Sequence, residues 1–136
     1  MARVDALASE RPTGDGPALF ERGAARDSTG HPAEAILLYR AALAAGLTGL
    51  RRRRANIQMA SSLRSLGQTE EAYVLLSAEL DAASDELDDA VRAFLALVLV
   101  DLGREREAIS ISLTALARHL PRYNRSLARY ARQLTT

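Results

Sequence analysis

The chain has 136 residues and a formal net charge of +1, with 48% hydrophobic and 26% charged residues, a composition typical of one ordinary globular domain. It contains no cysteine, which excludes disulfides and thiolate metal sites, and its near-neutral charge gives no global case for binding nucleic acid or membranes. Aromatic residues make up only 4%, so we expect a core of alanine and leucine in which helices pack closely.

Residues 1–15 are expected to form a short leader before a single domain over residues 16–136. Asp5 interrupts the leader and no apolar stretch follows it, so the segment does not match a secretory signal. The longest apolar run, residues 93–100, is far shorter than the roughly 20 residues that span a bilayer. We therefore expect a cytoplasmic protein.

The domain is predicted to consist of pairs of helices, each pair joined by a turn at a glycine. Gly30, Gly67 and Gly103 each follow a helical pattern, and glycine at that place accepts the left-handed backbone that ends a helix. Acidic residues then begin the partner helices, where the backbone dipole favours them. The predicted helices are 17–29 and 32–46, then 48–66 and one from Thr69, then one from Ser84 and its partner, which ends near Leu120.

A capping helix is predicted over residues 121–134, beginning at Pro121. Large apolar residues lie on one of its faces and arginines on the other, so one face should cover the last pair and the other should meet water. The apolar residues are Tyr123, Leu127, Tyr130 and Leu134, and the basic stripe is Arg122, Arg125, Arg129 and Arg132.

One pattern occurs three times: a small residue, then a glycine, then an alanine twelve positions after the small residue. The alanines are Ala35, Ala72 and Ala108, at intervals of 37 (35 to 72) and 36 (72 to 108), and a fixed period of this length is typical of stacked repeats. The small residues, Gly23, Ala60 and Ala96, should let the two helices of each pair approach closely. We predict an all-α solenoid of three helical hairpins, over residues 16–47, 48–83 and 84–120, with the capping helix.

This pattern resembles the tetratricopeptide repeat over about residues 16–120, and the capping helix extends the resemblance to 134. The later positions of the first repeat, Tyr39 and Ala42, also fit the family, whereas Arg22, Glu79 and Ser112 depart from it. The chain is similar to short, free-standing bacterial proteins of the group-5 type, for which no single activity is implied. The resemblance implies a non-enzymatic scaffold or adaptor that binds a protein or peptide, and no cofactor.

By the geometry of the family, the first helix of each repeat lines a concave groove that accepts a peptide or a helix. The resemblance implies an apolar floor with arginine on one wall. Some relatives hold a carboxylate in this groove with basic residues, but the matching positions here are not basic, so that role is unexpected. The implied groove residues are Phe20, Ala24, Asp27, Arg54, Ile57, Ser61, Arg64, Ala93, Leu97 and Val100.

Two other functions stay open. The same apolar surface could close a homodimer, because three repeats expose long flanks. The arginines of the capping helix could instead serve an accessory factor for nucleic acid, although no recognised nucleic-acid module accompanies them. The run Arg51–Arg54 points around the whole helix, so we interpret it as a solvated helix start that pairs with acidic residues of neighbouring helices.

Catalysis has little support in the sequence. The two histidines, His31 and His119, are far apart and have no metal-ligand spacing. The acidic cluster that begins at Asp85 is explained by its place at a helix start. We therefore expect no catalytic residue, no metal and no cofactor.

Overall fold

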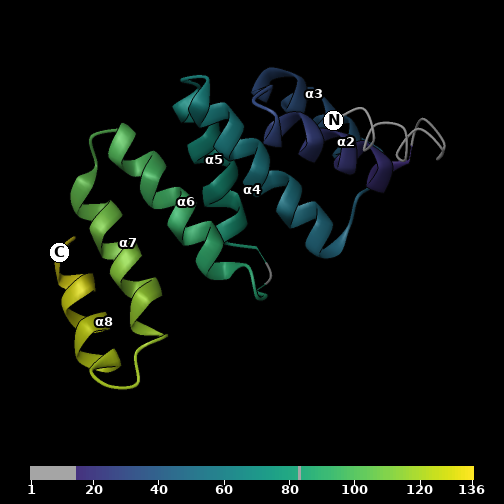
Figure 1. The fold of residues 1–136 in the computed structure, drawn as a ribbon. Helices are drawn as coiled ribbons and strands as arrows, with labels where there is room; N and C mark the ends of the chain where they lie inside the picture. Colours follow the sequence, from purple (N-terminus) through teal and green to yellow (C-terminus); the bar gives the residue numbers. More distant parts are fainter. Residues whose placement is uncertain (1–14, 83) are drawn as a thin grey trace.

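The computed structural model describes residues 15–82 and 84–136, and the regular structure in these two ranges is entirely α-helical. The predicted leader, apart from Asp15, lies outside the described residues. No helix in the described part is long and apolar enough to cross a membrane. In chain order the helices are α2 (Gly16–Ser28), α3 (Pro32–Ala44), α4 (Gly49–Ser65), α5 (Thr69–Leu80), α6 (Asp88–Asp101), α7 (Glu105–Ala117) and α8 (Asn124–Gln133) (Figure 1).

The three predicted hairpins are α2–α3, α4–α5 and α6–α7, and their turns have the same geometry. Gly30, Gly67 and Gly103 have φ of 79°, 80° and 75°, a conformation that glycine adopts without steric cost. After each glycine, the next N–H closes the helix end on a carbonyl five residues back. These bonds are His31 to Arg26 (2.8 Å), Gln68 to Leu63 (2.8 Å) and Arg104 to Leu99 (2.9 Å). The all-α solenoid is therefore confirmed.

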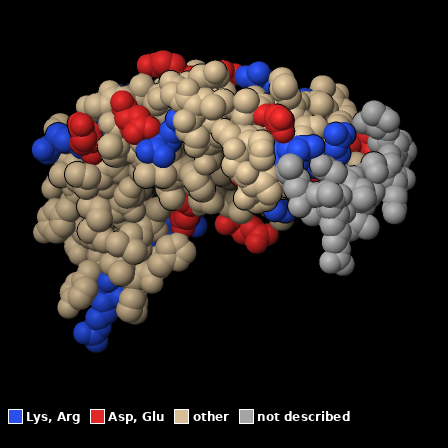
Figure 2. Space-filling model, turned by 45° about the horizontal axis from the view of Figure 1, so that its top comes forward, with Lys and Arg blue, Asp and Glu red and all other residues tan. Residues whose placement is uncertain are grey.

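The hairpins curve because their first helices pack together more closely than their second helices. The backbones of α2 and α4 contact each other, as do those of α4 and α6, whereas those of α3, α5 and α7 do not approach one another. The first helices therefore line the inner side of an arch, and the second helices form its outer side (Figure 1). Figure 2 shows the arched outline of the molecule.

Small residues allow the close approach within each hairpin, with one difference from the expected pairing. Ala35, Ala60 and Ala72 are fully buried. A Cβ atom added at Gly23 would lie 2.7 Å from Cε1 of Tyr39, so α2 approaches α3 at Tyr39, one turn beyond Ala35. Only a glycine leaves room there for the aromatic ring.

Two helix starts differ from the prediction. The third hairpin begins at Asp88 instead of Ser84, because the carboxylates of Asp85 and Asp88 bind main-chain N–H groups of the preceding turn: Leu87 N–H to Asp85 at 2.8 Å and Asp85 N–H to Asp88 at 3.1 Å. The last helix begins at Asn124 instead of Pro121, because Tyr123 has a φ of 68°, which breaks a right-handed helix.

The capping helix packs through smaller residues than predicted. Ala131 is buried, and Leu127 and Leu134 are half-buried, whereas Tyr123 and Tyr130 are exposed. Ser110 of α7 donates a hydrogen bond of 2.6 Å to the carbonyl of Ala131. This close approach of the two helices leaves the tyrosine rings at the edge of the contact.

Candidate partner-binding site

The inner side of the arch contains a pocket of about 260 Å³. It lies between the first helices of the three hairpins and includes the turn before α6. Four of the ten predicted groove residues, Asp27, Arg54, Ile57 and Ser61, are brought together here. The full lining is Asp27, Arg54, Ile57, Gln58, Ser61, Leu87, Ala90 and Phe94. We call it the concave pocket.

Asp27 joins the helices at one end of this pocket. Its two carboxylate oxygens accept hydrogen bonds from the hydroxyl of Tyr39 on α3 (3.0 Å) and from Ser62 on α4 (2.9 Å). The same Tyr39 hydroxyl lies 2.8 Å from the side-chain oxygen of Gln58. Burial and the neighbouring Asp27 carboxylate raise the pKa of Tyr39 well above its usual range, so this group stays protonated. Asp27 therefore fixes the end of the pocket.

Arg54 supplies the positive charge at the rim of the concave pocket. Its guanidinium carbon lies 5.0 Å from the centre of the Phe20 ring, within the range of a cation–π interaction. Phe20 is only 1% exposed, so it supports Arg54 from beneath and does not form an accessible floor. Ile57 is buried in the same way.

The remaining predicted groove residues lie away from the concave pocket. Arg64 is held by Asp101 of α6, with Nε 2.6 Å and Nη2 3.3 Å from the two carboxylate oxygens. Ala24 is half-buried on α2. The three residues of α6, Ala93, Leu97 and Val100, are exposed and do not line the pocket.

The arginine run at the start of α4 is only partly solvated. Arg53 is 2% exposed. Its Nη1 donates to carboxylate oxygens of Asp85 and Asp88, the latter at 2.7 Å. Burial works to lower the pKa of Arg53, but the hydrogen bonds to Asp88 and Asp85 raise it above its ordinary value. The expected pairing with acidic residues is confirmed, whereas the expected solvation of the run is wrong for Arg53.

Glu79, which replaces the alanine usual at its position, is the second buried charge of this cluster. Its carboxylate accepts hydrogen bonds from Arg52 (2.8 and 3.1 Å) and from Asn56 (2.7 Å). The main-chain carbonyl of Glu79 accepts from Arg53 at 3.0 Å. The cluster thus holds the turn before α6, and with it Leu87, in place as a wall of the concave pocket.

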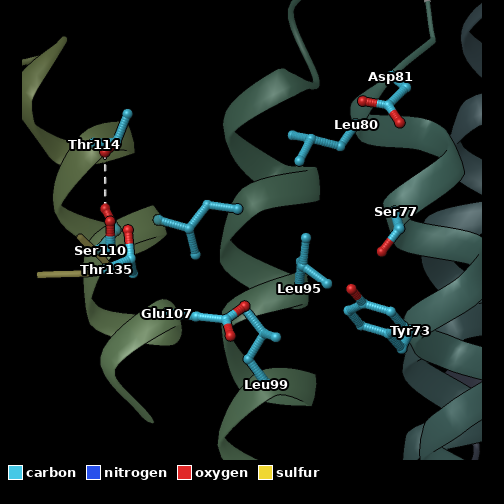
Figure 3. Close-up of a pocket in the computed structure, with 11 residues that line it drawn as sticks. Tyr73, Ser77, Leu80, Asp81, Leu95, Leu99, Glu107, Ser110, Thr114 and Thr135 are labelled. Atoms are coloured by element: carbon cyan, nitrogen blue, oxygen red, sulfur yellow. Dashed lines mark hydrogen bonds between the residues drawn. The ribbon is translucent and has the colours of Figure 1, made fainter. Parts of the chain in front are cut away.

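A larger cavity, of about 560 Å³, lies on the outer side between α5, α6 and α7 (Figure 3). The sequence analysis did not predict this cavity. Its lining includes two small polar residues, Ser77 of α5 and Thr114 of α7, which leave space between these helices. Several of its polar groups are bound within the chain: Glu107 lies 2.6 Å from Arg104, and Thr114 donates to the carbonyl of Ser110 at 2.8 Å. Fewer polar groups are thus left to orient a ligand here.

The predicted basic stripe is exposed but shorter than expected. Arg125, Arg129 and Arg132 lie on α8, whereas Arg122 precedes it. Acidic and basic side chains are interspersed on the face shown in Figure 2, which has no continuous basic band.

The two histidines lie in different parts of the fold and contact different side chains. His31 lies 3.1 Å from the hydroxyl of Thr29, and His119 lies 2.7 Å from Asp89. Within residues 15–82 and 84–136, no three histidine or acidic side chains are grouped so that they could hold a metal ion.

A family model described as tetratrico peptide repeat matches residues 16–134. No curated protein and no solved structure matches the chain.

Proposed function

Because the chain belongs to the tetratricopeptide repeat family, we propose that it is a non-enzymatic scaffold that holds an extended segment of a partner protein in the concave pocket. The observation that carries the proposal is the pairing of one exposed cation, Arg54, with an apolar wall. That wall is formed by Leu87, Ala90 and Phe94.

The chemistry of the concave pocket favours a particular kind of segment. Phe94, Ala90 and Leu87 are all half-buried, so an apolar side chain can displace water from them on binding. Arg54 offers N–H donors beside this wall, and a guanidinium binds a carboxylate more strongly than a neutral acceptor. The preferred segment therefore carries an acidic residue next to a large apolar residue.

A peptide array tests this preference. The purified chain is incubated with immobilised peptides in which acidic, basic, apolar and polar residues are combined at adjacent positions. We expect selection of peptides with adjacent apolar and acidic residues. Phe94→Glu should abolish that selection, because it places a negative charge in the apolar wall, whereas Arg54→Ala should remove only the preference for the acidic residue.

Val74→Glu is the matched control, because Val74 is exposed on α5, outside the concave pocket. It should bind the same peptides as the unaltered chain. Binding that survives Phe94→Glu, or an array with no selected peptide, would contradict the proposal.

A further inference from the structure

The cavity between α5, α6 and α7, which we call the outer cavity, has the size of a small-molecule site. Its volume of about 560 Å³ lies within the roughly 300–1,000 Å³ that is typical of such sites. Its floor is apolar and is formed by Leu95 and Leu99 of α6, Leu80 of α5 and Ile111 of α7. Leu80 and Ile111 are only half-buried, so an apolar ligand can displace water from them.

Polar residues line the outer cavity on both sides of this floor. Ser77 of α5 and Asp81 at the end of that helix are four residues apart, as are Ser110 and Thr114 of α7. Residues four apart lie on one face of a helix, so each pair faces the cavity together. Figure 3 shows Asp81 and Thr114 at one end of the cavity and Glu107 at the other.

The two hydroxyl groups on the α7 side can accept hydrogen bonds from a ligand but cannot donate them. Ser110 donates its hydrogen to the carbonyl of Ala131 at 2.6 Å, and Thr114 donates its hydrogen to the carbonyl of Ser110 at 2.8 Å. A hydroxyl group has one hydrogen and two lone pairs, so only the lone pairs remain. This side of the outer cavity therefore favours a ligand that is rich in donors.

The charged side chains that line the outer cavity, Asp81 and Glu107, are both acidic. Both carboxylate oxygens of Glu107 accept hydrogen bonds from Arg104, at 3.0 and 2.6 Å, so this charge is neutralised within the chain. Arg104 is itself held over the ring of Tyr73, with its guanidinium carbon 4.9 Å from the ring centre. The Asp81 carboxylate, in contrast, has no hydrogen bond or ion pair within residues 15–82 and 84–136, so it is available to a ligand.

The position of Asp81 adds to the attraction for a positive charge. Asp81 caps the C-terminal end of α5, where the backbone dipole is negative and favours cations. A metal ion does not suit this end of the cavity, because Ca²⁺ takes six or more oxygen ligands and the described residues hold no group of acidic or histidine side chains that could bind a metal. The apolar floor favours an organic cation instead.

We propose that the outer cavity binds a small organic amine in its ammonium form. The ammonium group lies at the Asp81 end of the cavity, where Thr114 accepts a second hydrogen bond, and the apolar body of the amine covers Leu80 and Ile111. An anion is disfavoured here, because it would face the Asp81 carboxylate. The outer cavity shares no lining residue with the concave pocket, so this proposal does not depend on the proposed function.

Titration of the isotope-labelled chain, followed by the amide signals in nuclear magnetic resonance spectra at neutral pH, tests the proposal. The probes are phenylbutylamine, phenylbutanol and phenylbutyrate, which share a ring and an alkyl chain but differ in charge. We expect phenylbutylamine to give saturable shifts at Ser77 and Ile111. Phenylbutanol should bind about fivefold more weakly, which is the most that an exposed ion pair typically contributes. Phenylbutyrate should not bind the outer cavity, and added salt should weaken the binding of the amine.

Two variants separate the charge from the cavity. Asp81→Asn should reduce the affinity for phenylbutylamine to that for phenylbutanol. Glu21→Gln is the matched control, because it removes the same charge from an exposed position on α2, and it should leave the affinity unchanged. The side chain of Ser77 points into the cavity (Figure 3), so Ser77→Phe should fill the space and abolish the binding of both probes. Circular dichroism should show the helical content of the unaltered chain for each variant.

Three results would overturn the proposal. The first is the absence of saturable binding of phenylbutylamine up to millimolar concentration. The second is equal affinity for the amine and the alcohol, or an affinity for the amine that Asp81→Asn does not change, since either would show that the carboxylate has no part in binding. The third is a set of shifts confined to the concave pocket, which would place the amine at the other site.

Discussion

Arg53 and Glu79 are buried side by side where α4 meets the end of α5. Nη2 of Arg53 donates a hydrogen bond of 3.0 Å to the main-chain carbonyl of Glu79, and its Nε lies 3.4 Å from the Glu79 carboxylate. Two buried charges are tolerated when their remaining hydrogen-bonding groups are also satisfied. Arg52 and Asn56 satisfy the Glu79 carboxylate, and Asp85 and Asp88 accept from Nη1 of Arg53. Among the described residues, Nε of Arg53 is the one buried side-chain polar atom without a hydrogen bond. The cluster thus links α4, α5 and the turn that walls the concave pocket.

Replacement of Glu79 should be among the most damaging single changes in the chain. Glu79→Ala restores the residue usual in the family but leaves the Arg53 Nε and the Asn56 amide without their acidic partner. Removal of one partner from a buried ion pair typically costs about 3–5 kcal/mol. Urea denaturation followed by circular dichroism would measure the loss. Glu21→Ala, at an exposed position of α2, should change stability by no more than about 0.5 kcal/mol.

A methyl group at Gly23 should also destabilise the first hairpin. The added Cβ of Gly23→Ala would lie 2.7 and 2.8 Å from two ring atoms of Tyr39, so the ring must move. Overpacking of this kind costs about 1–3 kcal/mol, whereas the better helix propensity of alanine returns up to about 1 kcal/mol. We therefore expect Gly23→Ala to unfold at a lower urea concentration than the unaltered chain. A gain in stability would show that the ring moves freely.

The fold was predictable because its signals are local. The spacing of Gly30, Gly67 and Gly103 fixes where three helices end, and each glycine has the left-handed φ that its turn requires. The starts of α6 and α8, which were predicted at the wrong residues, depend on neither periodicity nor spacing. Asp88 is tied to Arg53, 35 residues away along the chain, and Tyr123 adopts a conformation that tyrosine rarely takes.

The site was less predictable, because burial depends on the neighbouring repeat. Helical periodicity places Phe20 and Ala93 at equivalent positions, but Phe20 is buried and Ala93 is exposed. The reason is that α4 packs against α2, whereas within the described residues no later first helix packs against α6. Four consecutive arginines are alike in the sequence, but Arg53 is the one that is buried, against Glu79, Asp85 and Asp88. The residues of the concave pocket therefore emerge only once the hairpins are stacked.

Acid should destabilise the chain in part through Asp88. Hydrogen bonds from the Ser84 hydroxyl, the Asp85 N–H and Arg53 hold the pKa of the Asp88 carboxyl well below its usual range. In the unfolded chain an aspartate binds its proton near pH 4. The unfolded state then takes up a proton before the folded state does, so this contribution is complete above about pH 4 and is lost as the pH falls further.

Asp88→Asn tests this contribution. The variant should be less stable at neutral pH and should lose less stability than the unaltered chain between about pH 6 and pH 3. Thermal melts across that range would measure both effects. Asp81→Asn, at an exposed position, is the control, and its melting temperature should change with pH as that of the unaltered chain does. If the stability of Asp88→Asn fell with pH as steeply as that of the unaltered chain, other carboxylates would be responsible for the loss of stability in acid.

Tyr123 should be a site where substitution stabilises the chain. Its φ of 68° is a left-handed conformation that costs most residues roughly 1–2 kcal/mol, and its ring is 74% exposed, so little packing is lost when it is removed. Asparagine adopts this conformation more readily, and Tyr123→Asn should raise the melting temperature. Tyr130→Asn is the matched control, because Tyr130 is also exposed but lies within α8. There the lower helix propensity of asparagine gives no gain, so a rise at both positions would mean that loss of an exposed ring, and not relief of the backbone, is the cause.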